Sequence, residues 1–148
     1  MTRDARRVAE RHRWLWRANR ERLARQPRGQ REELLERLAK VRYREREVPD
    51  KGSTLEELLA TGEGDCEDLC AAWHALLETL LPDHWSIVAV LVPGGRAGWW
   101  HLALRLGNGR REWWFDPSVD AGMRPPPPLA AYGSNSAVVV ERRVVKAF

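Results

Sequence analysis

The sequence predicts an α+β protein, and two features of the chain carry that prediction. As far as Pro82, apolar residues recur at the three- and four-residue spacing of amphipathic helices. Beyond Pro82 they alternate at the two-residue spacing of strands, and Asn108-Gly109 between two such runs is a strong hairpin signal. Helices followed by hairpin-connected strands favour helices packed on a mainly antiparallel sheet. The 148 residues, 43% of them hydrophobic, suit one compact domain.

An amphipathic helix is predicted from about Arg3 to Gln26, because Pro27 blocks further helical hydrogen bonding. Its expected buried stripe recurs at helical spacing and consists of Ala5, Val8, His12, Leu15, Asn19 and Leu23. Trp14 and Trp16 lie two residues apart and cannot share one helix face, so at least one is expected to be exposed. The arginines of this helix fit a nucleic-acid patch or the solvated face of a packed helix, and the second interpretation is favoured because glutamates interrupt the charge.

A second helix is predicted from about Gln30 to Val41. Its apolar stripe consists of Leu34, Leu38 and Val41. This stripe is expected to pack on the first helix or on the body of the domain. Residues 1–42 are therefore interpreted as an N-terminal helical appendage, and residues 43–148 as the core of a chain that is compact overall.

A connector and a short helix follow. Residues 43–50 are expected to be extended, since Pro49 disfavours helical backbone before it. Ser53 and Glu56 have the spacing of a capping box at the start of the short helix. Gly62 is expected to end that helix.

The next helix is predicted to be the most deeply buried one. It begins with Gly64 or Asp65 at its cap and ends before Pro82. Its long apolar face consists of Leu69, Ala72, Trp73, Leu76, Leu77 and Leu80. Cys66 lies in its first turn.

Four strands are predicted after this helix, over residues 85–92, 99–106, 111–116 and 137–146. A two-residue turn at the hairpin signal pairs Leu104 with Trp113 and His101 with Asp116. Directly opposed residues point to the same face with Cβ atoms roughly 4.5 to 5.5 Å apart. His101 and Asp116 are therefore expected within hydrogen-bonding distance.

Cys66, His101 and Asp116 supply a thiol, an imidazole and a carboxylate, which are the parts of a thiol nucleophile site. A helix start presents free backbone N–H groups and positive potential, which favour a thiolate at Cys66. The expected chemistry is attack of this thiolate on an acyl carbon, with His101 relaying the proton and Asp116 orienting the imidazole. The backbone N–H of Cys66 is the expected oxyanion donor, and the sequence identifies no second donor.

Two sets of neighbours bear on this site. The acidic residues Asp65, Glu67 and Asp68 oppose thiolate formation at Cys66, so an imidazolium partner gains importance. Trp100 and Trp114 lie beside the expected base and acid and are candidates for binding substrate.

Three motifs resemble those of the transglutaminase-like superfamily of the papain-like class. They are Gly64-Asp65-Cys66-Glu67-Asp68, Trp100-His101 on a strand, and Trp114-Phe115-Asp116-Pro117-Ser118. The first motif is most similar to bacterial and phage-associated transglutaminase-like cysteine peptidases. The resemblance covers about residues 43–123 and implies a transglutaminase-like catalytic core over residues 43–148.

By that resemblance Cys66 is the nucleophile, His101 the base and Asp116 the orienting acid. It implies a cysteine peptidase, amidase or acyltransferase that works through a thioester on a protein or peptide acyl substrate, without a cofactor. Hydrolysis is expected over cross-linking. The similarity to phage-associated members also makes a virion or prophage context an expectation.

Two alternatives stay open. Cys66, Cys70 and His74 follow one another at four-residue spacing as a possible metal site, which is disfavoured because zinc sites more often use cysteine pairs two to four residues apart. The other alternative is an inactive transglutaminase-like module for phage or prophage assembly, with the Arg- and Trp-rich N-terminal helices as its contact surface for a protein partner or a second copy.

The sequence predicts a cytoplasmic protein of a bacterial or phage-infected cell. An i,i+4 disulfide between Cys66 and Cys70 within a helix would be badly strained, so both are expected to be reduced thiols. No run approaches the roughly 20 apolar residues that span a bilayer, and the N-terminus lacks an apolar leader. No membrane association is expected.

Overall fold

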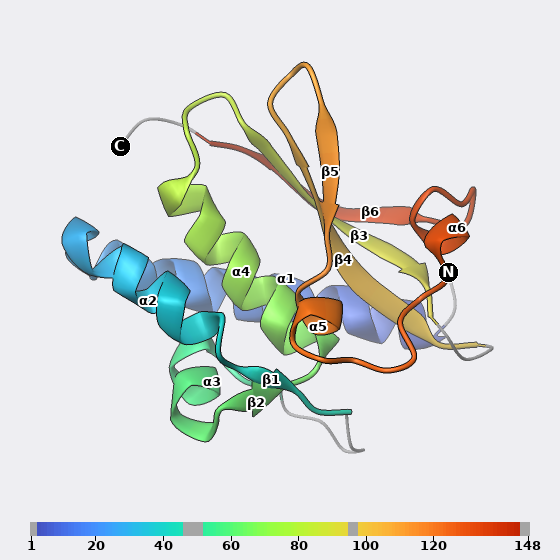
Figure 1. Cartoon of the computed structure of the whole chain (residues 1–148), viewed down its shortest axis with the longest axis horizontal. Coiled ribbons are helices and arrows are strands. Elements are labelled where there is room, and N and C mark those ends of the chain that lie inside the picture. Colours follow the sequence, from blue (N-terminus) through green and yellow to red (C-terminus); the bar gives the residue numbers. More distant parts are fainter. Residues whose placement is uncertain (1–2, 46–51, 95–97, 146–148) are drawn as a thin grey trace.

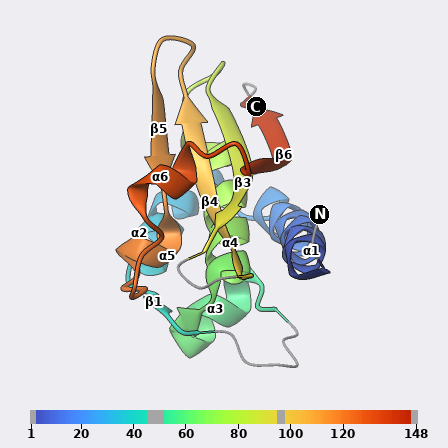
Figure 2. The same cartoon turned by 90° about the vertical axis from the view of Figure 1, so that its right-hand side faces the viewer.

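The structure, a computed structural model, describes residues 3–45, 52–94 and 98–145. Its centre is a four-stranded antiparallel sheet in the order β5-β4-β3-β6, formed by β3 (Ser86–Pro93), β4 (Trp100–Gly107), β5 (Glu112–Phe115) and β6 (Val138–Val144). Helices α1 (Arg3–Ala24) and α4 (Cys66–Leu80) pack on one face of this sheet (Figures 1 and 2). The α+β prediction is confirmed.

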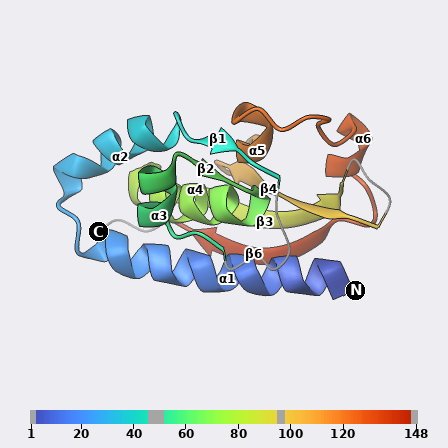
Figure 3. The same cartoon turned by 90° about the horizontal axis from the view of Figure 1, so that it is seen from below.

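Helix α1 buries the whole stripe that its sequence predicts, namely Ala5, Val8, His12, Leu15, Asn19 and Leu23. Of the two tryptophans, Trp16 is 1% exposed and Trp14 is 59% exposed, which confirms that they occupy different faces. The helix runs along one side of the molecule, next to α4 (Figure 3). Arg3, Arg6 and Arg17 lie outside this stripe and are exposed.

The N-terminal segment shares its hydrophobic core with the rest of the chain. A 3-10 turn, η1 (Arg28–Gln30), leads into α2 (Arg31–Leu38), whose Leu34 and Leu38 are buried. These leucines and Leu15 belong to the same buried cluster as Leu69 and Leu76 of α4. Burial of such side chains stabilises the fold by about 1.5 to 3 kcal/mol each.

Among the described residues, no helix combines the length and the apolar character that crossing a membrane requires. Helix α1 is long enough at 22 residues, but its outer face is charged.

Helix α3 (Leu55–Thr61) begins one residue later than its predicted capping box. Thr54, not Ser53, is the N-cap, and it forms the box with Glu57. The Ser53 backbone N–H is instead used elsewhere, as it donates to Asp68 Oδ1 at 2.7 Å. Gly62 ends the helix as predicted, with a left-handed φ of 78°.

Two very short strands, β1 (Arg42–Tyr43) and β2 (Glu63–Gly64), pair in parallel. β2 ends directly before Asp65, the N-cap of α4. The sequence does not predict this pair, because two-residue strands carry no periodicity. The predicted extended connector begins in β1, and its residues 46–50 lie outside the described residues. The pair places Tyr43 beside Gly64, next to the start of α4.

Helix α4 is the most buried helix, as predicted: ten of its 15 residues are buried, against eight of 22 in α1. Leu69 and Leu76 face α1 and α2, whereas Cys70 belongs to the cluster that packs on the sheet. The helix therefore joins the two buried clusters of the molecule.

Successive side chains of β3 point to opposite faces of the sheet. Ile87, Ala89 and Leu91 of β3 face α1 and α4, and Val88, Val90 and Val92 face Ala131 of the short helix α6 (Leu129–Tyr132). Each of the four strands begins one residue after its predicted start. The expected last residue of the fourth strand, Lys146, lies outside the described residues.

Candidate active site

Cys66 is the first residue of α4, and a capping box fixes this helix start. The Asp65 side chain accepts a hydrogen bond from the Asp68 backbone N–H at 3.1 Å, and Asp68 Oδ2 accepts one from the Asp65 N–H at 3.2 Å. A Cβ at Gly64 would lie 2.3 Å from Leu58 Cδ2, so a larger residue there would displace the buried Leu58 side chain. Two of the three acidic neighbours of Cys66 are thus committed to the helix cap.

The third acidic neighbour, Glu67, is fully buried beside the thiol. Its Oε2 lies 3.7 Å from Cys66 Sγ, and its Oε1 lies 3.2 Å from Arg7 Nη2 of α1. A carboxylate that opposes thiolate formation therefore lies beside Cys66, as the sequence predicts. It also forms an ion pair with Arg7 of the N-terminal helix. Nothing in the local pattern around Cys66 indicates this partner.

His101 and Asp116 form the second part of the site. Both are buried, and His101 Nε2 lies 2.7 Å from Asp116 Oδ2. Asp116 also caps α5 (Pro117–Asp120), because its Oδ1 accepts a hydrogen bond from the Val119 N–H at 3.3 Å. Since a carboxylate only accepts hydrogen bonds, Nε2 of His101 carries the proton of the neutral ring and Nδ1 is its basic nitrogen.

The predicted hairpin register is wrong by two residues, although the His101–Asp116 pair forms. Leu104 faces Phe115 and not Trp113. The loop has four residues, from Asn108 to Arg111, and is centred one residue later than predicted. A shift of two residues keeps every side chain on its face, so the histidine and the aspartate meet on the diagonal instead of directly across the ladder.

The side chain of Asn108 accounts for the longer loop. Its Oδ1 accepts hydrogen bonds from the backbone N–H groups of Arg110 at 2.9 Å and Arg111 at 2.8 Å. Gly109, which lies between Asn108 and Arg110, has a positive φ of 88°. This side-chain turn competes with the tighter two-residue turn that Asn-Gly usually predicts.

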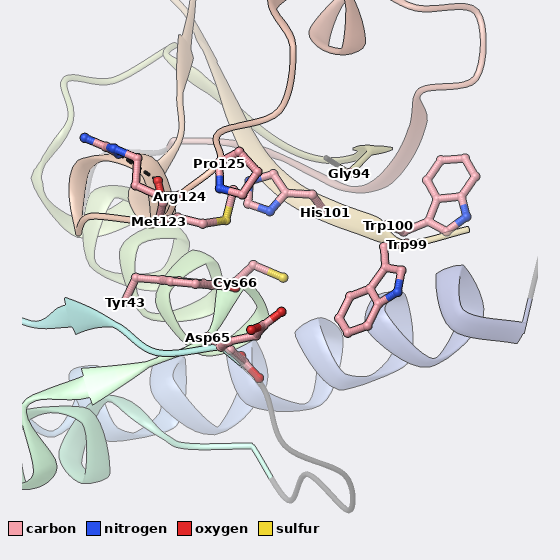
Figure 4. A pocket seen from close by; sticks show the side chains of 11 residues that line it. Tyr43, Asp65, Cys66, Gly94, Trp99, Trp100, His101, Met123, Arg124 and Pro125 are labelled. Atoms are coloured by element: carbon pink, nitrogen blue, oxygen red, sulfur yellow. Dashed lines mark hydrogen bonds between the residues drawn. The ribbon is translucent and has the colours of Figure 1, made fainter. Parts of the chain in front are cut away.

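Cys66 and His101 line one pocket from opposite sides. Figure 4 shows the Cys66 sulfur pointing into this pocket below the His101 ring. The other residues of the lining are Tyr43, Glu45, Asp65, Gly94, Trp99, Trp100, Met123, Arg124 and Pro125. The helix start and the histidine–carboxylate pair, which are far apart in the sequence, therefore share one solvent-accessible space.

The two predicted substrate-binding tryptophans have different positions. Trp100 lines the pocket, whereas Trp114 lies outside the lining and packs against Tyr132 with ring centroids 5.3 Å apart. Trp99 also lines the pocket and is 39% exposed. The sequence could have indicated Trp99 as a pocket residue, because it directly precedes Trp100. Met123 reaches the pocket from the chain beyond α5, and no local pattern marks it.

Tyr132 of α6 is a further member of the site that the sequence does not indicate. Its hydroxyl donates to Asp116 Oδ2 at 2.7 Å, the same oxygen that binds His101. Burial first, and then the neighbouring Asp116 carboxylate, raise the pKa of Tyr132, so the phenol stays protonated and acts as a donor. Burial and the charge of Asp116 also raise the pKa of Asp120.

Replacing Tyr132 with phenylalanine is expected to slow the reaction of Cys66 with iodoacetamide about three- to tenfold near neutral pH. The change removes one hydrogen bond to Asp116, for which about 1 kcal/mol is typical, and keeps the ring that packs on Trp114. Mass spectrometry of the alkylated protein over time gives the rate. Tyr132→Leu is the companion variant, which also removes the ring packing. An unchanged rate in Tyr132→Phe would show that Asp116 does not depend on this donor.

The metal-site alternative finds no geometric support in the described residues. They contain no group of three His, Cys, Asp or Glu side chains placed to hold a metal ion. Cys70 is fully buried in the core, and burial, followed by the charges of Asp116 and Glu67, raises its pKa well above the usual value. Neither cysteine forms a disulfide. Cys70 is therefore an unreactive internal reference for Cys66.

Comparison with known proteins adds no relative: the chain matches no protein-family model, no curated protein and no solved structure. The arrangement of residues around the pocket is therefore the basis of the functional proposal.

Proposed function

We propose that this protein is a thiol-dependent acyl hydrolase or acyltransferase of the transglutaminase-like, papain-like kind, with Cys66, His101 and Asp116 as its catalytic triad. The observation that carries the proposal is the buried 2.7 Å contact between His101 and Asp116 in the same pocket that Cys66 lines. Two features activate a cysteine nucleophile: a histidine that a carboxylate orients, and the N-terminus of a helix that carries the cysteine.

The proposed reaction begins when the Cys66 thiolate attacks the acyl carbon of an amide. The new carbon–sulfur bond places negative charge on the acyl oxygen, and the backbone N–H of Cys66 is the proposed donor to it. His101, protonated at Nδ1, then gives its proton to the leaving amine as the carbon–nitrogen bond breaks, leaving a thioester. Asp116 holds Nε2 throughout and stabilises the imidazolium.

The second half of the reaction releases the acyl group. His101 accepts a proton from water as the water oxygen attacks the thioester carbon, and Cys66 leaves as a thiolate. An amine in place of water would give transfer instead of hydrolysis. We favour hydrolysis of a protein or peptide acyl substrate, and the proposed steps use groups of this chain, the substrate and water. Two cysteines without a disulfide also support the proposal of a reducing, cytoplasmic setting.

The proposal is tested by comparing the two cysteines of the same molecule. Iodoacetamide at neutral pH is expected to alkylate Cys66 at least about 10²-fold faster than Cys70, because Cys66 lines a pocket and Cys70 is fully buried with a raised pKa. Peptide mapping after timed quenching gives both rates, and Cys66→Ala identifies the fast site. Equal, slow labelling of both thiols would contradict the proposal.

An inactive module that binds a partner through the N-terminal helix is the second candidate function. One observation favours it: Trp14 is 59% exposed on the outer face of α1, one turn before the exposed Arg17. A protein partner or a second copy suits this surface better than nucleic acid. Binding that survives Cys66→Ala and is lost on Trp14→Ala would support this function.

A further inference from the structure

The first two turns of α1 contact both halves of the candidate site. Arg7 Nη2 lies 3.2 Å from Oε1 of Glu67, the residue that follows Cys66 on α4. Asp4, one turn earlier on the same face, accepts a hydrogen bond at 3.1 Å from the backbone N–H of Trp100, the first residue of β4. Arg7 Nη2 and Asp4 Oδ1 are 3.4 Å apart. One chain of contacts thus runs from the nucleophile helix through α1 to the strand of the histidine.

Glu67 is the member of this chain with a direct effect on the thiol. Its side chain is fully buried, and its Oε2 lies 3.7 Å from Cys66 Sγ. A carboxylate charge at this distance, away from water, disfavours a second negative charge on the sulfur. Arg7 places a positive charge on the other oxygen of the same carboxylate. The field at the sulfur therefore depends on a residue of the N-terminal helix.

We propose that Arg7 is a positioning residue of the thiol site, which compensates the charge of Glu67 and so lets Cys66 ionise at lower pH. The inference rests on the proposed function, because it concerns the reactivity of the proposed nucleophile. It gives the N-terminal helix a role in the chemistry as well as in packing. The reactive core and α1 are then one functional unit.

Other titratable groups also face the thiol, and the test must separate Arg7 from them. They come from the helix cap, the pocket lining and the histidine–carboxylate pair: Asp65, Asp68, His101, Asp116, Glu45, Arg124 and Tyr43. The substitutions below leave all of them in place. A double-mutant cycle between Arg7 and Glu67 then isolates the interaction of this one pair.

The experiment measures the rate of Cys66 alkylation by iodoacetamide against pH in six proteins. These are the wild type, Arg7→Met, Arg7→Lys, Glu67→Gln, the Arg7→Met/Glu67→Gln double variant and Arg6→Met. Methionine keeps an apolar stem without the charge, and glutamine keeps the shape of glutamate. Arg6 is an exposed neighbour of Arg7 on the same helix and serves as the matched control.

Arg7→Met is expected to raise the midpoint of the pH–rate profile by about one unit, which slows alkylation about tenfold below the midpoint. Arg6→Met is expected to leave the profile unchanged. Glu67→Gln is expected to lower the midpoint, and the double variant is expected to return it close to the wild-type value. Arg7→Lys, which keeps the charge, should rescue most of the shift.

Several outcomes would overturn the inference. If Arg7 acts only in packing, Arg7→Met lowers the rate equally at all pH values without moving the midpoint, and Glu67→Gln gives no rescue. If Arg7→Met does not fold, Glu67→Gln alone decides, since an unmoved midpoint there contradicts the proposed field effect. A wild-type Cys66 that reacts no faster than Cys70 overturns both this inference and the proposed function. A fast wild-type Cys66 with unshifted variants overturns this inference alone.

Discussion

Replacing His101 with alanine is expected to slow the alkylation of Cys66 by iodoacetamide about 10²-fold at about pH 6. An unperturbed thiol is less than about 1% ionised at this pH, whereas a thiol paired with an imidazolium is largely ionised. His101 is the proposed source of that imidazolium, and Asp116 holds its Nε2 at 2.7 Å. Alkylation rates from timed quenching and peptide mapping give the comparison.

The size of this effect should depend on pH. Above about pH 9 the thiol ionises without help, so the rates of wild type and His101→Ala should converge. His84→Ala is the matched control, because the His84 side chain is 90% exposed and distant in sequence from the three motifs. A loss of rate that is the same at all pH values would mean that His101 supports the fold of the site and not the thiolate.

Lowering the pH from 7 to 4 is expected to cost about 3 kcal/mol of folding stability through His12 alone. His12 of α1 is fully buried against His74 of α4, and His12 Nε2 lies 3.2 Å from His74 Nδ1. Burial, and then the charge of Arg13, lowers the pKa of His12 to about 3. Burial also lowers the pKa of His74, with His12, Arg143 and Arg20 adding to the shift.

The sign of this effect follows from proton binding. Below about pH 6.5 the unfolded chain takes up a proton at His12, whereas the folded protein resists it until about pH 3. The contribution of His12 to folding stability is therefore fully present above about pH 6.5, and it is lost as the pH drops toward 3. Because the pair joins α1 to α4, acidification weakens the contact between these two helices.

Urea denaturation at pH 7 and pH 4 measures this dependence. His12→Leu should lose about 3 kcal/mol less than the wild type between the two pH values, even if its stability at pH 7 is lower. His84→Gln is the control, since it replaces an exposed histidine outside the contact between α1 and α4. An equal decrease in the free energy of unfolding of His12→Leu and wild type would show that carboxylates, and not this histidine, cause the loss of stability at low pH.

Much of the fold follows from the sequence because its elements are long and strongly periodic. The buried stripe of α1 was predictable from spacing alone, and so was the start of every strand in the main sheet to within one residue. The choice between Trp14 and Trp16 follows from the same stripe, since Trp16 lies next to Leu15 and one turn after His12.

Two parts of the fold were not predictable in this way. The hairpin register depends on whether Asn108 adopts a tight turn or accepts hydrogen bonds from two backbone N–H groups, and both are common for asparagine. The parallel pair of β1 and β2 has two residues in each strand, too few for a pattern.

The candidate site divides similarly. The sequence places Cys66, His101 and Asp116 in suitable elements, because their neighbours set the helix cap and the strand faces. Tyr132 and Arg7 reach the site from α6 and α1 through tertiary packing. No local signal marks either one, since a tyrosine after prolines and an arginine among arginines are ordinary surface residues by sequence.

Mass spectrometry of the protein after rapid mixing with an activated acyl ester tests directly whether Cys66 is a nucleophile. One acyl group is expected on the Cys66 peptide and should disappear with time as the free acid forms, whereas Cys70 should stay unmodified. Cys66→Ala should form no adduct and should release acid only at the rate of the buffer. An acid-release rate that Cys66→Ala shares with the wild type would contradict the central claim that Cys66 is a catalytic nucleophile.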